Sequence, residues 1–386
     1  MRITRIRAFA PRGARPGTSG GSWLSESRIA NPMSIYPEYA ERRSSWNGPP
    51  QSPVYVKVET DEGITGWGRG GGGLAATAVI EGHFAPLLEG KDPFDIEKLW
   101  DIMWRASMPY GRKGLAIHAL SGVDVALWDV VGKAKNEPVW RLLGGLTKDR
   151  VPVYSTNNDV ALTMRHGVRR AKLAMPYGPA DGWQGMQGNV EHVRRARELL
   201  GPDGELMLDC YMAWNVEYTL RMAELLEPLR IRWIEEFLPP DDYDGHAEVK
   251  RQIRGMAVAT GEHEYTRWGH LELLKRNAVD ILQPDVHWCG GITELKRIGQ
   301  VASAFNIPVI PHAGGGSAEA QAVVFSSVNC PLFECFFGRE PGEPRPPALF
   351  EGLAEPEEGY IRPWTAPGLG LAVNAELFER TFGEQP

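Results

Sequence analysis

The second half of the chain alternates short apolar runs with helix-type segments, and this rhythm constrains the fold more than any other feature. The β-type runs are VPVYST, RRAKLAM, ELMLDCY, IRWIEEF, GMAVATGEH, VDILQPD, IPVIPH and PLFECFF. Segments such as EHVRRARELL and ITELKRIGQVASAF separate most of them. Strands that alternate with helices form a parallel sheet, and eight such units over about 200 residues predict a (β/α)8 barrel.

The first part of the chain mixes strand and helix signals. MRITRIRAFA alternates in polarity, and SPVYVKVETDEGITGWG contains two strand-like runs joined at Asp61-Glu62-Gly63. From Gly114 to Asn136, apolar residues recur at steps of three and four, which predicts an amphipathic helix that ends before Pro138. Between MRITRIRAFA and SPVYVKVETDEGITGWG, the segment Gly17–Gly48 is rich in Gly, Ser and Pro, and we expect it to form a lid over an active site.

These signals divide the chain into three parts. We predict an N-terminal α+β capping domain, an enolase-like modified TIM barrel, and a Pro- and Gly-rich C-terminal segment that returns to the capping domain. Their predicted ranges are 1–136, 137–350 and 351–386.

Composition and charge exclude several classes of partner. The 386 residues carry a net charge of -7, which gives no basic surface for nucleic acid or an anionic membrane. We find no run of about 18 apolar residues and no signal peptide, so we expect a cytoplasmic protein. The four cysteines show no metal-binding spacing, so we expect buried free thiols and no disulfide. The 13 tryptophans favour a homo-oligomer, although large cores also use tryptophan.

Successive β-type runs each end in a polar residue of chemical interest, about 25 residues after the previous one, which is the length of one βα unit. In a barrel the carboxyl ends of all strands meet at one rim, so we expect these side chains to converge. They are Asp209, Glu235, Glu262, Asp285, His312 and Glu334.

Three adjacent strands supply a carboxylate each, from Asp209, Glu235 and Glu262. A site of hard oxygen donors suits Mg2+ rather than zinc, which favours His or Cys. Any one of these acids could instead cap the helix that follows it, but three in succession indicate a metal site. If the strand continues past Glu235, Glu236 points to its opposite side, which makes it the less suitable ligand.

His312 and Asp285 come from neighbouring strands, and a carboxylate bonded to one imidazole nitrogen raises the basicity of the other. This pair predicts a general base, although a lone histidine is more often structural. Lys172, near the end of the second barrel run, is predicted to bind substrate, and the alternative is a solvated or carboxylate-pairing lysine.

At these motifs the chain resembles a known family. MLDCYM, RWIEEFLPP, GEHEY, ILQPDVHWCGG and VIPHAGG are similar to the enolase superfamily, mandelate racemase subgroup, and within it to the L-rhamnonate dehydratases. The resemblance runs from MRITRIRAF to the closing PGLG.

The resemblance implies a role for each site residue. Asp209, Glu235 and Glu262 match the family's Mg2+ ligands, and His312 with Asp285 matches its catalytic dyad. Glu334 matches an acid that contacts the substrate carboxylate or its enolate. His263 either assists departure of the leaving group or supports the site as a polar neighbour. Arg43 matches a substrate-binding arginine of the capping loop, although Arg42 beside it leaves the register open.

Two departures from the family pattern bear on the reaction. Many relatives carry Lys-x-Lys on the second barrel strand, whereas this chain has Lys172-Leu173-Ala174. Racemisation by two bases needs groups on both faces of the carbanion, so the missing lysine favours an elimination that one histidine can drive. The capping loop SGGSWLSESRIANPMS also lacks the histidines of rhamnonate dehydratases, so the distal end of the substrate is read differently.

The implied function is a Mg2+-dependent hydro-lyase that converts an aldonate to a 2-keto-3-deoxy acid. L-Rhamnonate, L-lyxonate and L-mannonate all remain open as substrates. An epimerase or racemase of the same subgroup, and a sugar-acid sensor without turnover, are the alternatives. Gly66–Gly71 fits the G-x-G-x-x-G dinucleotide pattern, but it lies in a hairpin rather than a βαβ unit, so we reject that interpretation.

Overall fold

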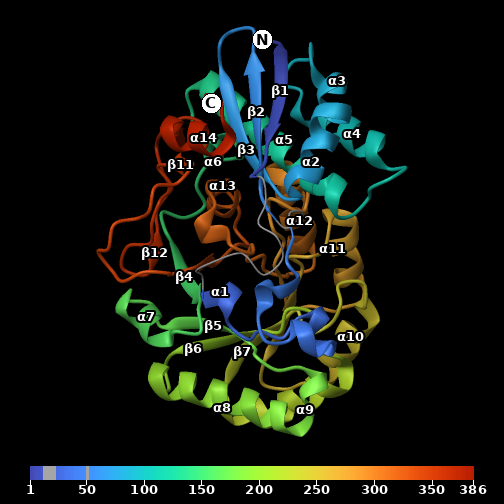
Figure 1. Cartoon of the computed structure of the whole chain (residues 1–386), viewed down its shortest axis with the longest axis vertical. Helices are drawn as coiled ribbons and strands as arrows, with labels where there is room; N and C mark the ends of the chain where they lie inside the picture. The colour runs from blue at the N-terminus through green and yellow to red at the C-terminus, as the bar shows by residue number, and fades with distance from the viewer. Residues whose placement is uncertain (12–22, 49–51) are drawn as a thin grey trace.

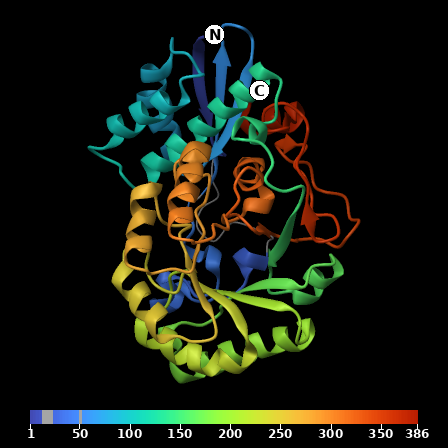
Figure 2. The ribbon, with the colours of Figure 1, turned by 180° about the vertical axis from the view of Figure 1, so that it is seen from behind.

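The computed structural model describes residues 1–11, 23–48 and 52–386. A three-stranded sheet occupies one end of the molecule and a curled parallel sheet the other, with both termini near the smaller sheet (Figure 1). The reverse view shows helices along the outside of the parallel sheet (Figure 2). The mixed α/β prediction is confirmed.

The smaller sheet is antiparallel, with β1 (Ile3–Phe9), β2 (Val54–Thr60) and β3 (Thr65–Gly70) in sequence order. The predicted hairpin is therefore confirmed, and Gly63 supplies the positive φ of 76° that its tight turn needs. Helical segments that follow β3 pack beside the sheet. They are α2 (Gly73–Val79), η5 (Ile80–Phe84), α3 (Ala85–Leu88) and α4 (Ile96–Ser107).

The long helix α5 (Leu115–Lys135) confirms the predicted helix, but its predicted amphipathic character is wrong. It packs against β3 on one side and against α12 (Gly291–Ala304) on the other, so most of its surface is buried. Among the described residues, α5 alone is long and apolar enough to cross a membrane. Because 83% of its most apolar window is buried, α5 is a core helix joining the two parts of the molecule.

The glycines of β3 have a packing role. A Cβ atom on Gly66, Gly68 or Gly70 would lie 2.2 to 2.4 Å from a backbone carbonyl oxygen of α5. Only glycine allows helix and strand to approach this closely. The glycine pattern is therefore explained by the contact between β3 and α5, without a dinucleotide.

The parallel sheet contains seven strands in the order β10-β4-β5-β6-β7-β8-β9, and β12 (Tyr360–Ile361) pairs antiparallel with β4. Seven of the eight predicted runs form strands. Their bounds are β4 (Val151–Thr156), β5 (Arg170–Ala174), β6 (Glu205–Asp209), β7 (Ile231–Glu235), β8 (Ala257–Thr260), β9 (Ile281–Leu282) and β10 (Phe333–Cys335).

The remaining run, IPVIPH, forms only an isolated bridge between Val309 and Leu282. Pro308 and Pro311 flank this bridge and have no backbone N–H to donate, so a regular ladder cannot extend there.

Helices connect the strands and cover the sheet, as Figure 1 shows. They are α6 (Val139–Leu142), α7 (Val160–Arg165), α8 (Gly182–Leu200), α9 (Val216–Leu226), α10 (Tyr243–Gln252), α11 (Thr266–Lys275), α12 and α13 (Ala318–Phe325). The four cysteines are free and buried, in agreement with the expectation.

The C-terminal segment lies beside the smaller sheet (Figure 1). It contains β11 (Phe350–Glu351), β13 (Ala372–Val373) and α14 (Ala375–Phe382). The Phe378 ring of α14 lies 5.0 Å from Phe9 of β1 and 5.2 Å from Trp67 of β3, between ring centroids. The exact boundaries at residues 136 and 350 stay predictions.

The capping segment that precedes β2 reaches the rim of the barrel. It holds α1 (Trp23–Glu26) and the short helices η1 (Pro32–Ile35), η2 (Pro37–Tyr39) and η3 (Arg43–Trp46). Ala30 N donates a 2.8 Å hydrogen bond to Met175 O just after β5. The expected lid began at Gly17, and residues 17–22 lie outside the described residues.

A buried carboxyl group ties α5 to the barrel. Asp124 accepts hydrogen bonds from Thr293 N (2.9 Å) and Thr293 Oγ1 (2.5 Å), in the first turn of α12. It thus caps the amino end of a helix that belongs to the other part of the molecule. Burial, only partly opposed by the Thr293 hydrogen bonds, raises the pKa of Asp124 to about 7 from 3.8.

Because the unfolded chain releases the Asp124 proton at lower pH than the folded chain, the stability that this group contributes falls as pH rises from about 4 to about 7. Asparagine keeps an acceptor and carries no charge. We expect Asp124→Asn to lower the melting temperature more at pH 5 than at pH 8. Asp124→Ala should cost about 1–3 kcal/mol at pH 5, because it leaves buried donors unpaired. If the difference in melting temperature between the wild-type protein and Asp124→Asn did not change with pH, this explanation would be contradicted.

Candidate active site

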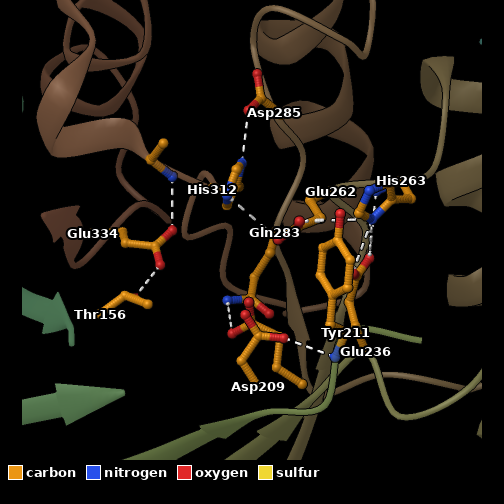
Figure 3. Close-up of polar contacts among 12 residues, drawn as sticks. Thr156, Asp209, Tyr211, Glu236, Glu262, His263, Gln283, Asp285, His312 and Glu334 are labelled. Carbon is orange, nitrogen blue, oxygen red and sulfur yellow. Dashed lines mark hydrogen bonds and ion pairs between the residues drawn. The ribbon is translucent and has the colours of Figure 1, made fainter. Parts of the chain in front are cut away.

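Most of the predicted site residues lie at one rim of the parallel sheet, on the ends of strands or in the turns that follow them, and Figure 3 shows six of them: Asp209, Glu262, His263, Asp285, His312 and Glu334. Lys172 lies within β5, and Arg43 lies in η3 of the capping segment. β6 and β7 pair so that Asp209 lies beside Glu235. Glu262 follows β8 after Gly261, whose φ of 134° only glycine adopts easily. The three acids expected to bind a metal thus come from three adjacent strands.

Lys172 lies beneath these acids and is fully buried. Its Nζ is 2.8 Å from Glu334 Oε1 and 3.8 Å from Asp209 Oδ2, and it forms an ion pair with Glu235. Burial alone would lower the pKa of Lys172, but Glu235 and Glu334 raise it well above its usual value. Lys172 is therefore a carboxylate-pairing cation and not a solvated one.

Three neighbouring side chains bind the Glu235 carboxylate. It accepts hydrogen bonds from Gln283 Nε2 (2.6 Å) and Trp233 Nε1 (3.0 Å), in addition to its ion pair with Lys172. Burial raises the pKa of Glu235 to about 8, while Lys172 acts in the opposite direction. A second cation near Glu235 would favour its ionised form.

Glu262 has an open coordination position. Its Oε2 is buried and accepts no hydrogen bond among the described residues, although a buried carboxylate oxygen ordinarily has a donor. Burial raises the pKa of both Glu262 and Asp209. An acidic, desolvated oxygen cluster with an unpartnered acceptor fits a hard divalent cation.

The strand does not continue to Glu236, so the condition under which Glu236 was expected to point away from the site is not met. β7 ends at Glu235, and Glu236 adopts a left-handed conformation with φ of 45°, which returns its side chain to the rim. The Glu236 carboxylate lies 2.9 Å from His263 Nδ1. Donor atoms of Glu236, Glu262 and His263 all lie within 4.8 Å of one another, so Glu236 also belongs to the set that could contact a cation.

His312 and Asp285 form the predicted pair. His312 Nδ1 lies 2.7 Å from Asp285 Oδ2, and His312 Nε2 lies 3.6 Å from Glu262 Oε2. Burial alone would lower the pKa of His312, but Glu262, Asp285 and Glu334 raise it to about 10. One ring nitrogen is thus fixed by a carboxylate while the other faces the acids, which is the arrangement of a general base.

A second histidine–carboxylate pair faces the same acid. His263 Nδ1 lies 3.6 Å from Glu262 Oε1, and Glu236 holds the same nitrogen. Burial opposes protonation of His263, but Glu236 and Glu262 raise its pKa to about 9. Figure 3 shows His312 and His263 on either side of Glu262.

The remaining predicted residues also reach the site. The Glu334 carboxylate accepts from Ala313 N (2.7 Å) and from Thr156 Oγ1. The Arg43 guanidinium lies 3.9 Å from the ring centroid of Tyr211, whereas Arg42 pairs with Glu26 at the surface. Of the two arginines, Arg43 is the one that faces the rim.

Several residues at this rim were not predicted from the sequence. Tyr211 and Gln283 lie two residues from Asp209 and Asp285, and the Trp288 ring lies 5.3 Å from the rings of both His263 and His312. Their proximity in sequence to the strand-end acids was the available signal.

Comparisons with known proteins agree with this geometry. Residues 47–144 match the N-terminal domain of the mandelate racemase / muconate lactonizing enzyme family, and residues 158–377 match the enolase C-terminal domain-like family. The chain is 37% identical to an L-rhamnonate dehydratase from Saccharopolyspora erythraea, over 98% of both chains.

Two solved structures are also similar. The rhamnonate dehydratase from Gibberella zeae complexed with Mg has a TM-score of 0.93 at 38% identity, covering 98% of this chain and 95% of that one. A racemase from Streptomyces coelicolor with bound magnesium has a TM-score of 0.80 at 26% identity, covering 98% and 99%.

The unpartnered Glu262 Oε2 makes this residue the most direct test of metal binding. Mg2+ should raise the melting temperature of the wild-type protein, and Glu262→Gln should weaken Mg2+ binding at least tenfold in titration calorimetry, since it removes an anionic ligand. Glu264→Gln is the matched control, because Glu264 pairs with Lys113 and Tyr243 instead. Equal Mg2+ affinities for the two variants would refute the assignment.

Proposed function

Because this chain belongs to the mandelate racemase / muconate lactonizing enzyme family, with its enolase-like C-terminal domain, we propose that it is a Mg2+-dependent sugar-acid dehydratase acting on L-rhamnonate or a closely related aldonate. The observation that carries the proposal is the His312–Asp285 pair, whose free Nε2 lies beside Glu262. The rhamnonate dehydratases at 37% and 38% identity support the substrate class.

Asp209, Glu235 and Glu262 are the residues that hold Mg2+ in this proposal. The ion would stabilise the negative charge of the enolate and offset the carboxylate charge that raises the pKa of His312. Lys172 lies behind these ligands, where its ion pairs with Glu235 and Asp209 orient their carboxylates, and Glu334 holds Lys172 in place at 2.8 Å. Arg43, which is positively charged and faces Asp209 and Glu262, is placed to bind the substrate carboxylate or a hydroxyl.

The reaction begins when His312 Nε2 removes the proton at C2, breaking the C2–H bond and leaving an enolate. His263, protonated through Glu236, then donates a proton to the 3-hydroxyl while the C3–O bond breaks, so that water leaves. The resulting enol tautomerises to the 2-keto-3-deoxy acid. The products are this keto acid and one water molecule, with no redox change.

The proposal also includes a cytoplasmic homo-oligomer. Large side chains exposed on the single chain, among them Tyr110, Trp183 and Trp268, are the surfaces that an interface would cover. Light scattering of the purified protein measures the oligomeric state.

Replacing His312 should abolish catalysis without removing the metal. We expect His312→Asn to lose at least 1,000-fold in kcat, about 4 kcal/mol of barrier, in a 2-keto acid assay with L-rhamnonate, L-lyxonate and L-mannonate. Mg2+ affinity should stay within a few-fold of wild type. His246→Asn is the control, since His246 is buried in α10 and bonds Asp242 O. An active His312→Asn enzyme refutes the base assignment, and C2 deuterium exchange without keto acid from the wild type indicates an epimerase.

The role of His263 has its own test. If His263 is the acid, His263→Asn should still exchange the C2 proton with solvent deuterium, through His312, while forming keto acid at least tenfold more slowly. Proton NMR in deuterium oxide follows both events in one sample. Keto acid formation at the wild-type rate would show that His312 also supplies the leaving-group proton.

A further inference from the structure

Asp285, the carboxylate that fixes the His312 ring, is itself bound through its second oxygen. Asp285 Oδ2 contacts His312, and Asp285 Oδ1 accepts a 2.7 Å hydrogen bond from the backbone N of His287. The His287 ring also turns back, with Nδ1 3.2 Å from Asp285 Oδ1. Both oxygens of Asp285 are therefore engaged by imidazole groups.

The contacts continue beyond His287. The His287 Nε2 atom lies 3.6 Å from Glu319 Oε1, and this nitrogen has no hydrogen-bond partner among the described residues. Glu319 stands in the first turn of α13, where Ser317 Oγ donates to its Oε2 at 2.7 Å. A row of four side chains thus runs from His312 through Asp285 and His287 to Glu319.

This row reaches the smaller sheet. Glu319 lines a cavity of about 230 Å3 together with Arg69 of β3 and Phe350 of β11. His287 and Glu319 side chains are only 4% and 7% exposed, so solvent does not replace their contacts. The position of Asp285 is in this way linked to α13 and to the cavity that Glu319 shares with the smaller sheet.

Two carboxylates on either side of one imidazole favour the form with a proton on each nitrogen. His287 then donates from Nδ1 to Asp285, and the carboxylate plane of Asp285 is fixed rather than free to rotate. Partners of this kind, one step removed from the reacting group, orient it and change rates without touching the substrate.

We propose that His287 and Glu319 are positioning residues that hold Asp285 in the orientation in which it fixes the His312 ring. For turnover measurements this inference rests on the proposed dehydratase function. It assigns no contact with substrate to either residue.

The kinetic test compares five variants of the Mg2+-loaded enzyme. His287→Leu should lower kcat at least tenfold while KM stays within twofold, because only the base is displaced. His287→Asn, which keeps a donor at the Nδ1 position, should recover part of that loss. Glu319→Gln should lower kcat less than His287→Leu and add nothing to it in the double variant. His246→Asn, the matched loss of another buried imidazole, should leave kcat unchanged.

A spectroscopic readout does not depend on knowing the substrate. The proton between His312 Nδ1 and Asp285 should give a low-field 1H NMR signal, identified by its absence in His312→Asn. That signal should shift in His287→Leu and in Glu319→Gln, and not in His246→Asn.

The outcomes separate the two proposals. A wild-type enzyme that converts no aldonate would overturn the dehydratase function, while the NMR signal would still test the positioning role. An unchanged signal with wild-type kcat in the His287 and Glu319 variants overturns the positioning role. If His287→Leu does not fold, His287→Asn and Glu319→Gln decide by the same criteria.

Discussion

The structure depends on how charge is balanced at the carboxyl rim of the parallel sheet. Asp209, Glu235 and Glu334 are drawn together there with little access to water, and such a cluster is unstable unless cations neutralise it. Lys172 contacts all three from within the barrel. His312 adds positive charge on the other side of this cluster, so each of the three acids has a cationic neighbour. Glu262 has two histidines at 3.6 Å, but its Oε2 accepts no hydrogen bond among the described residues, which leaves it open to a divalent ion.

Gathering these groups requires the chain to turn sharply where the strands end. Glu236, Tyr211 and Ala313 all have φ between 44° and 51°, a left-handed conformation that non-glycine residues adopt at a cost of about 1–3 kcal/mol each. Hydrogen bonds from Cys210 N to Glu235 O and from Met212 N to Glu236 O continue the β6–β7 pairing beyond the strands and hold the turns. These three left-handed residues therefore lie in segments that aim side chains at the site, although residues such as Asn136 and Arg230 adopt the same conformation elsewhere.

The sequence allowed the barrel rhythm and the strand-end residues to be predicted because both follow from local patterns. Side-chain alternation failed at Glu236, since it assumes that the strand continues and a left-handed turn cancels it. Periodicity likewise identified α5 but not its burial on two sides, which depends on the glycines of β3. His287 and Glu319 could not be paired from sequence, because only the folded chain brings the turn after β9 to within 3.6 Å of the first turn of α13.

The same contacts bear on why the site suits elimination better than racemisation. Inverting a carbon needs a second free base across from His312. Lys172 cannot serve, because its ammonium group is occupied by three carboxylates that would be left uncompensated if it moved. Ala174, where relatives carry a second lysine, lies beside Asp209 in the ladder and offers only a methyl group. With that face inert, the proposed mechanism has the proton removed by His312 lead to loss of the 3-hydroxyl, with the His263–Glu236 pair as the acid.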